Sequence, residues 1–166
     1  ISTSARSCVT MLSLLENLQG KDCAAYISAH QQIADTFSLT KNGWSTAGET
    51  NDSTRILNEL SPYHIRTIHT NRWFCYCVPP GYSIEIYLFQ FTNKSKDILI
   101  ANYNSIFYND AVWHTPEDLC FFKGSTLISG SVSHENICFV YNENLQLPGL
   151  WEKKPSVLAE QISIPE

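Results

Sequence analysis

The stretch from Asp22 to Phe37 limits what this chain can fold into more than any other segment. Apolar side chains recur in it at steps of three and four residues: Tyr26, Ala29, Ile33 and Phe37. This spacing places them on one face of a helix, which must then be buried against a core. A chain of 166 residues is long enough to supply that core as a single domain.

The start of this predicted helix places a cysteine at its first turn. Gly20 interrupts whatever precedes it, and Asp22 can act as the N-cap, so Cys23 becomes the first helical residue. A thiol there feels the positive end of the helix dipole, which favours the reactive thiolate. Cys23 is therefore a candidate nucleophile, and the alternative is a disulfide between Cys23 and Cys8.

Other helical and loop segments follow from periodicity and composition. Residues 7–19 form a predicted first amphipathic helix, with Met11, Leu12, Leu15 and Leu18 on one face. Residues 38–53 are rich in Thr, Asn, Gly and Ser and read as a surface loop. Ser53 to Leu60 is a predicted short helix that ends before Pro62.

The second half of the chain has the composition of strands and turns. Strands are predicted at Arg66–Val78, Tyr82–Phe91, Asp97–Ala101, Ser105–Tyr108, Leu119–Lys123 and Ile137–Tyr141. Alternation in the second of them, with Ile84, Ile86 and Leu88 opposite Glu85, Tyr87 and Phe89, predicts a strand with two usable faces. The region between the last two strands reads as a Ser/Gly-rich turn, and the chain after Pro148 as loose with a weak helical signal at Val157–Ile162.

These segments predict an α+β fold in which N-terminal helices pack on an antiparallel sheet. We expect one domain over residues 1–166, divided into a helical part at 1–42, a loop and β insertion at 43–113, and core strands with a C-terminal tail at 114–166.

Charge and hydropathy bear on partners and location. The formal net charge is −5 and Lys and Arg do not cluster, which argues against nucleic acid as a partner. No stretch is long and apolar enough for a transmembrane helix. The sequence begins at Ile1 without an initiator Met, so we expect a trimmed product exported to the periplasm or the extracellular space.

Six cysteines favour an oxidising compartment. The natural pairs by sequence are Cys8 with Cys23 and Cys120 with Cys138, which leaves Cys75 and Cys77 without an obvious partner. If Cys23 is free for chemistry, Cys8 could instead pair with Cys75 or Cys77. A competing use of those two is metal binding together with His64 and His69, but this spacing is not a standard zinc pattern. We therefore predict no metal site and no cofactor.

Three short runs of the sequence stand out together: Asp22-Cys23-Ala24-Ala25-Tyr26-Ile27, Pro116-Glu117-Asp118-Leu119-Cys120-Phe121-Phe122 and Ser133-His134-Glu135-Asn136-Ile137. They resemble motifs of the NlpC/P60 group of papain-like cysteine peptidases and amidases. The first is similar to the family's D-C-S-G-F/L-V motif at a helix start, the second to its P-G-D-L-V-F-F strand and the third to its H-V-G-I-Y strand.

The resemblance implies a papain-like fold with residues 43–113 as an insertion, and it implies a catalytic set. Cys23 would be the nucleophile, His134 the general base, and Gln146 the polar residue that orients the base. The implied reaction is acyl transfer from a peptide or amide substrate: thiolate attack, an acyl-enzyme, then hydrolysis.

A function of a different class also fits the sequence. The acidity, the cysteines as plain disulfides and the loss of the family's motif glycines, which are replaced by Ala25, Glu117 and Asn136, suit a non-catalytic, exported, disulfide-stapled binding protein. An immunity or inhibitor protein that caps a toxin or enzyme is one example, and its partner would be a protein.

Replacement of Cys23 by Ser separates these hypotheses. If Cys23 is the nucleophile, the variant should lose hydrolytic activity and keep its melting temperature. If Cys23 is a half-cystine, the variant should lose about 2–5 kcal/mol of unfolding free energy in chemical denaturation. Activity that persists in a folded Cys23→Ser variant would contradict the nucleophile hypothesis.

Overall fold

The computed structural model describes residues 7–9, 12–14, 19–41, 51–73, 76–106, 115–133, 137–140, 151–153 and 157–159. Its central feature is an antiparallel sheet of eight strands. Their spatial order is β11 (Trp151–Lys153), β2 (Leu12–Leu14), β10 (Ile137–Val140), β9 (Thr126–Val132), β8 (Glu117–Lys123), β3 (Thr36–Lys41), β7 (Ile84–Gln90) and β4 (His64–Thr70).

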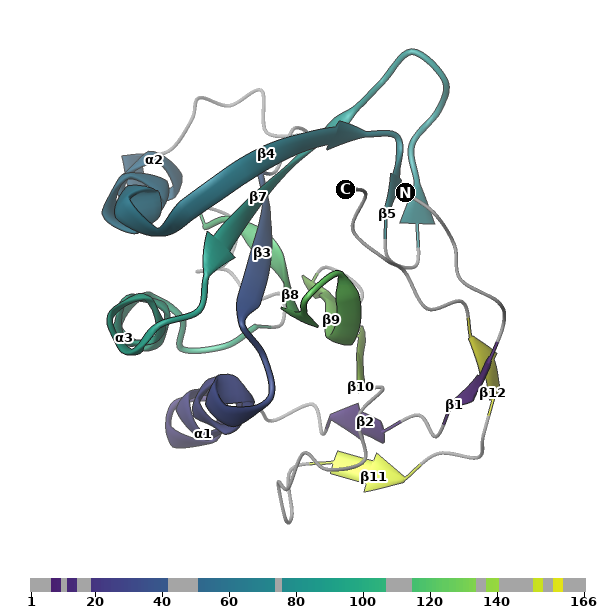
Figure 1. The fold of residues 1–166 in the computed structure, drawn as a ribbon, viewed down its shortest axis with the longest axis horizontal. Coiled ribbons are helices and arrows are strands. Elements are labelled where there is room, and N and C mark those ends of the chain that lie inside the picture. Colours follow the sequence, from purple (N-terminus) through teal and green to yellow (C-terminus); the bar gives the residue numbers. More distant parts are fainter. Residues whose placement is uncertain are drawn as a thin grey trace.

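Two further strand pairs lie outside this sheet: β1 (Ser7–Val9) with β12 (Val157–Ala159), and β5 (Arg72–Trp73) with β6 (Tyr76–Cys77). Three helices stand in a row beside the sheet in Figure 1: α1 (Lys21–Ala29), α2 (Asn51–Leu60) and α3 (Asn93–Asn102). Short 3-10 turns at His30–Gln32 and Ser61–Tyr63 follow α1 and α2. The α+β class with an antiparallel sheet is thus confirmed.

A cluster of buried hydrophobic residues lies on each face of the sheet. The helix-side core joins buried residues of α1, α2 and α3 to Phe37, Leu39, Phe89, Leu119 and Phe121 of the strands. The opposite core consists of Trp73, Ile84, Ile86, Leu88, Cys120, Phe122, Leu127 and Val132. The predicted alternation in β7 is confirmed, because Ile84, Ile86 and Leu88 face one core while Phe89 and Tyr87 face the other.

Irregularities in two strands redirect their side chains. In β8 the register against β3 shifts between Ser38 and Thr40, and Asp118 there has a φ of 57°, a left-handed conformation that is uncommon outside glycine. In β9 the register against β8 shifts so that Ile128 is an extra residue. As a result both Ile128 and Ser129 lie toward the helix-side core.

Several predicted elements are confirmed. The short helix before Pro62 is α2, and the predicted strands at 82–91, 119–123 and 137–141 correspond to β7, β8 and β10 within their described residues. The segment 66–78 is β4 followed by the short β5–β6 pair.

Other predictions are wrong. The described residues of the predicted helix at 7–19 form β1, β2 and an isolated bridge at Gln19, and none of them is helical. The helix predicted from Asp22 to Phe37 ends at Ala29, because the chain turns through 3-10 geometry and enters β3, so Phe37 is a strand residue and Ser38–Lys41 is no loop.

Three more corrections concern the second half. Asp97–Ala101 belongs to α3, because Thr92 and Ser95 form a capping box that starts a helix. The Ser/Gly-rich turn after Lys123 is largely strand β9, and Val157–Ala159 is strand β12 without helical geometry. Phe107 and Tyr108, in the predicted strand at 105–108, lie outside the described residues.

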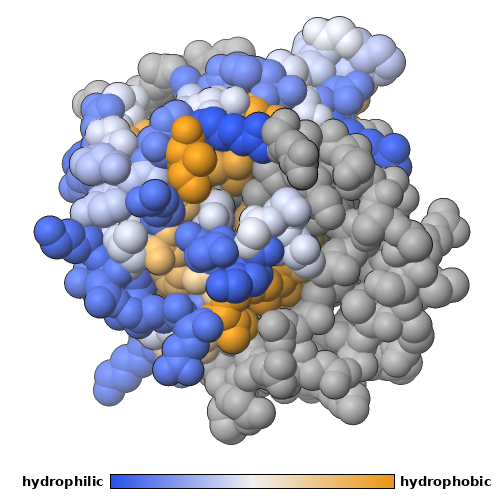
Figure 2. All heavy atoms as spheres, viewed as in Figure 1, coloured by the Kyte–Doolittle hydropathy of each residue, from blue (hydrophilic) through white to orange (hydrophobic). Residues whose placement is uncertain are grey.

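Polar residues dominate the visible surface. Figure 2 shows hydrophilic residues over most of the described part of one face, with apolar residues visible between them. Among the described residues, no helix is both long and apolar enough to cross a bilayer.

The capping box of α3 gives a test of the corrected helix. Thr92 Oγ1 accepts the Ser95 N–H at 3.1 Å, and Ser95 Oγ accepts the Thr92 N–H at 2.8 Å. We expect Thr92→Ala to lower the free energy of unfolding by about 1 kcal/mol in urea titration. Thr92→Ser, which keeps the hydroxyl, should lose much less; equal losses in the two variants would contradict a capping role.

Candidate functional site

The start of α1 is held against the segment that follows α3 by backbone contacts. Gln19 bridges to Ser105, and the Gly20 N–H donates to the Asn104 carbonyl at 2.8 Å. Gly20 has a φ of 56° and is the N-cap, so the tight entry into the helix needs a residue without a side chain. Asp22 is therefore the second helical residue and not the predicted cap.

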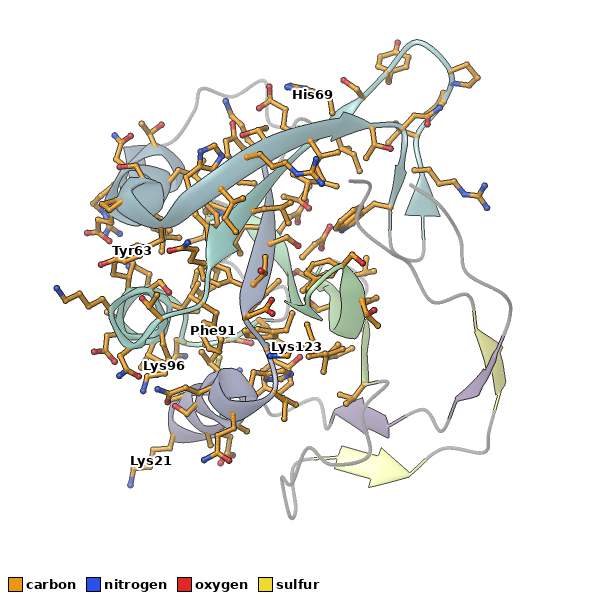
Figure 3. All side chains as sticks on the ribbon, viewed as in Figure 1. Lys21, Tyr63, His69, Phe91, Lys96 and Lys123 are labelled. Carbon is orange, nitrogen blue, oxygen red and sulfur yellow. The ribbon has the colours of Figure 1, made fainter. Side chains whose placement is uncertain are left out.

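Cys23 is the third residue of α1 and is fully buried. Lys21 points away from the body of the molecule in Figure 3, whereas Cys23 two residues later has 0% exposure. Burial raises the pKa of the Cys23 thiol to about 11, and a hydrogen bond from the Ile106 backbone offsets only part of that rise. Loss of hydration therefore outweighs the helix dipole, contrary to the expected activation.

Cys23 is also a free thiol, so the predicted disulfide with Cys8 is not formed. Cys120 and Cys138 are free as well, which makes their predicted pairing wrong. The reason is topological: Cys120 is on β8 and Cys138 on β10, and β9 runs between these strands. The side chains of Cys75 and Cys77 lie outside the described residues.

Tyr103 connects Cys23 to the segment that resembles the family's P-G-D-L motif. Its hydroxyl donates to the Pro116 carbonyl at 2.6 Å. Burial, followed by the nearby Glu117 carboxylate and the Cys23 thiol, raises the pKa of Tyr103 far above its usual range, so both groups lie within its electrostatic reach. Burial and then the charge of Asp118 raise the pKa of the half-buried Glu117 to about 7, so this carboxyl can exchange a proton near neutral pH.

Asp118 and Ser133 join the second and third motif segments. The Ser133 N–H donates to Asp118 Oδ1 at 2.8 Å, and the Asp118 N–H donates to Ser133 Oγ at 3.1 Å. Both residues are buried. Ser133 directly precedes His134 in the chain, but His134 itself and Gln146 lie outside the described residues.

A second polar cluster, the α1–β9 chain, lies deeper in the core and consists of Tyr26, His30, Ser129 and Cys138. His30 Nδ1 is 2.8 Å from the Tyr26 carbonyl, which can only accept, so this nitrogen carries the hydrogen. Nε2 then accepts from Ser129 Oγ at 2.7 Å. The Tyr26 hydroxyl donates its hydrogen to Ser129 Oγ at 3.3 Å. It also lies 3.2 Å from Cys138 Sγ, and since its own hydrogen is already used, the Cys138 thiol is the donor of that second hydrogen bond.

The α1–β9 chain is structural despite containing a serine and a histidine. His30 and Ser129 both have 0% exposure, so no substrate reaches them. The His30 ring stacks on Phe121 with centroids 3.9 Å apart, and burial lowers the pKa of His30 to about 3. His30 is thus a neutral core residue, and Tyr26, four residues earlier on the same helix face, was the sequence signal for that role.

The described side chains contain no group of three or more His, Cys, Asp or Glu residues able to hold a metal ion. Glu117 and Ser133 have no sequence signal as site residues beyond their place in the motif segments. Glu117 and Cys23 both lie within electrostatic reach of Tyr103, which brings together segments far apart in the sequence.

Comparison with known proteins adds no assignment: no family model, curated protein or solved structure matches the chain.

The buried His30 should make stability depend on pH. Its pKa is near 3 when folded and about 6.5 when unfolded, so the unfolded state binds more protons between these values. Its contribution to stability is complete above pH 6.5 and is lost as the pH falls, at up to about 1.4 kcal/mol per pH unit.

Urea titrations of the wild type and of His30→Gln at pH 4.5, 5.5, 6.5 and 7.5 measure this contribution. The difference between the two curves should shrink as the pH falls. Glu117 has a raised pKa and contributes in the opposite direction, but it is present in both proteins and cancels. Parallel curves would contradict a neutral, buried His30.

Proposed function

We propose that this chain is a non-catalytic binding domain. The observation that carries the proposal is the state of Cys23, the residue on which thiol chemistry would depend. Its side chain has 0% exposure, so a substrate carbonyl cannot approach the sulfur without local opening of the fold. With a pKa of about 11, roughly one Cys23 thiol in ten thousand is ionised at pH 7.

The second polar cluster supports the same proposal. The Ser129 hydroxyl and the His30 ring are hydrogen-bonded to each other, as a serine nucleophile is to its general base, yet both side chains are fully buried in the core. Each polar side-chain hydrogen of the α1–β9 chain is already donated to an acceptor within that cluster. A binding domain needs such groups only to fix its packing.

Disulfide bonds are not needed for this proposal. The described part of the chain contains three free, buried thiols, and its two cores are built from apolar side chains on both faces of the sheet. A partner protein, such as the toxin or enzyme held by an immunity or inhibitor protein, remains the partner class we propose.

A thiol amidase or peptidase of the NlpC/P60 type is the second candidate, and one observation favours it. Ser133 of the S-H-x-x-I segment is bonded to Asp118 of the P-E-D-L segment, and Tyr103 lies within electrostatic reach of both Glu117 and Cys23. Segments similar to all three family motifs therefore approach one another. In this candidate, opening of the chain around Cys23 would have to precede catalysis.

Thiol reactivity distinguishes the two candidates. We expect iodoacetamide to label Cys23 in the native protein at least about 100-fold more slowly than in urea-unfolded protein at the same pH, because the thiol is buried and protonated. Peptide mapping by mass spectrometry identifies the site, and the unfolded sample provides the matched reference.

The pH dependence completes the test. Labelling of a protonated Cys23 should rise steadily from pH 6 to pH 9 without a plateau. Fast, selective labelling of native Cys23 at pH 6 would overturn the binding-domain proposal and support the thiol hydrolase.

A further inference from the structure

The loop between β6 and β7, residues 78–83, projects from the body of the molecule. Figure 1 shows it extending past the ends of β4 and β7, and in Figure 3 it continues outward beyond the labelled His69. Every residue from 79 to 83 is exposed. Tyr82 has 69% exposure, the highest of any large apolar side chain in the described part of the chain. Residues 79–82 are called the loop tip below.

Both ends of this loop are fixed to the fold. Val78 packs against the opposite core, and its N–H donates to the Asn71 carbonyl at 2.8 Å. Ile84, on the other side of the tip, is buried and pairs with Thr70 of β4. The loop tip is therefore presented to solvent from an ordered base, which limits the conformational entropy that a partner must remove on binding.

A tight turn closes the loop tip. The Tyr82 N–H donates to the Pro79 carbonyl at 3.1 Å, and Gly81 has a φ of 92°. Proline at the second position and a positive φ at the third are typical of a type II turn. In such a turn Pro80 has a φ of about −60° and a ψ of about +120°, close to the polyproline II conformation. Gly81 is thus the residue that departs from an extended, proline-rich backbone.

Gly81 has room to change conformation. A Cβ atom added there would meet no other atom within 4 Å. Rotation of Gly81 to a negative φ breaks one hydrogen bond, between Tyr82 and Pro79, and both of these residues are exposed. Since glycine populates positive and negative φ about equally well, the extended form of the loop tip is accessible.

The chemistry of the loop tip matches one mode of protein recognition. Its sequence is Pro-Pro-Gly-Tyr, and residues 78–83 carry no charge. SH3 and WW domains bind proline-rich segments in polyproline II conformation through grooves lined by aromatic side chains, and WW domains select the pattern Pro-Pro-x-Tyr. The proline rings are apolar and restrict the backbone in advance, and the tyrosine adds an aromatic ring with a hydroxyl at its edge.

We propose that the loop tip is a recognition segment for a partner protein with a WW-type aromatic groove, which binds residues 79–82 in extended form. The loop tip includes neither Cys23 nor any residue of the α1–β9 chain. The inference therefore goes beyond the proposed function and stands or falls separately from it. A Cys23→Ala variant should bind the partner domain as the wild type does.

The probe is a ¹⁵N-labelled WW domain that selects Pro-Pro-x-Tyr peptides, titrated with the whole chain and followed by amide shifts. We expect saturable binding with a dissociation constant on the order of 100 μM. Tyr82→Ala and Pro80→Ala should each weaken binding at least about tenfold, because each removes a ring that the groove contacts. The matched control is Ile65→Ala, at the other exposed large apolar side chain, and it should leave binding unchanged.

Gly81→Ala tests the conformation that binds. A residue with a Cβ is strained at a φ of 92°, so the substitution disfavours the closed turn and raises the population of the extended form. We expect this variant to bind the WW domain about two- to fivefold more tightly and to melt at a lower temperature. A mutation that merely damaged the loop would lower both affinity and stability.

Three outcomes would overturn the proposal: no saturable shifts with the wild type, binding that survives both Tyr82→Ala and Pro80→Ala, or weaker binding by Gly81→Ala. None of them bears on the reactivity of Cys23. Conversely, fast labelling of Cys23 would overturn the proposed function and leave the loop tip unaffected.

Discussion

Hydrogen bonding between α1 and β9 is the constraint on which the rest of the helix-side core depends. Tyr26 on the inner face of α1 and His30 at the start of the following 3-10 turn have polar atoms that would be costly to bury without partners. Ser129 supplies those partners, and it can do so only because the irregularity in β9 turns it toward the helix. The position of α1, and with it the position of Cys23, follows from this match.

The same burial decides the chemistry of Cys23. The positive end of a helix stabilises a thiolate by about 0.3–1 kcal/mol. A thiol pKa raised from 9.0 to about 11 corresponds to roughly 3 kcal/mol in the opposite direction. The loss of hydration therefore affects the pKa of Cys23 more than the helix dipole does. A cysteine at a helix start becomes a nucleophile only where the fold also leaves it a hydrated or charged environment, and a sequence motif does not report that environment.

Local patterns predicted part of this fold well. The alternation in β7 and the end of α2 before Pro62 depend only on residues close together in the chain, so both could be predicted from the sequence. The end of α1 was not, because Ile33 and Phe37 continue the helical spacing although the chain turns and Phe37 packs from a strand. The apolar run Ile98-Leu99-Ile100 in α3 suggested a strand, while the capping pair Thr92 and Ser95 was the local signal that outweighed it. Of the candidate site, Cys23 could be identified as a helix-start cysteine, but its burial, its free thiol and its neighbour Tyr103 depend on long-range packing.

Within the described part of the chain, three buried thiols on three different elements give this fold a built-in set of reporters. Cys23 is on α1, Cys120 on β8 and Cys138 on β10; Cys23 and Cys138 belong to the helix-side core and Cys120 to the opposite core. A sulfur reacts only when its own surroundings open, so the relative protection of the three would show whether helix and sheet separate as one cooperative unit or in stages. The free cysteines, each of which belonged to a predicted disulfide pair, can thus report the order in which the helix and sheet layers unfold.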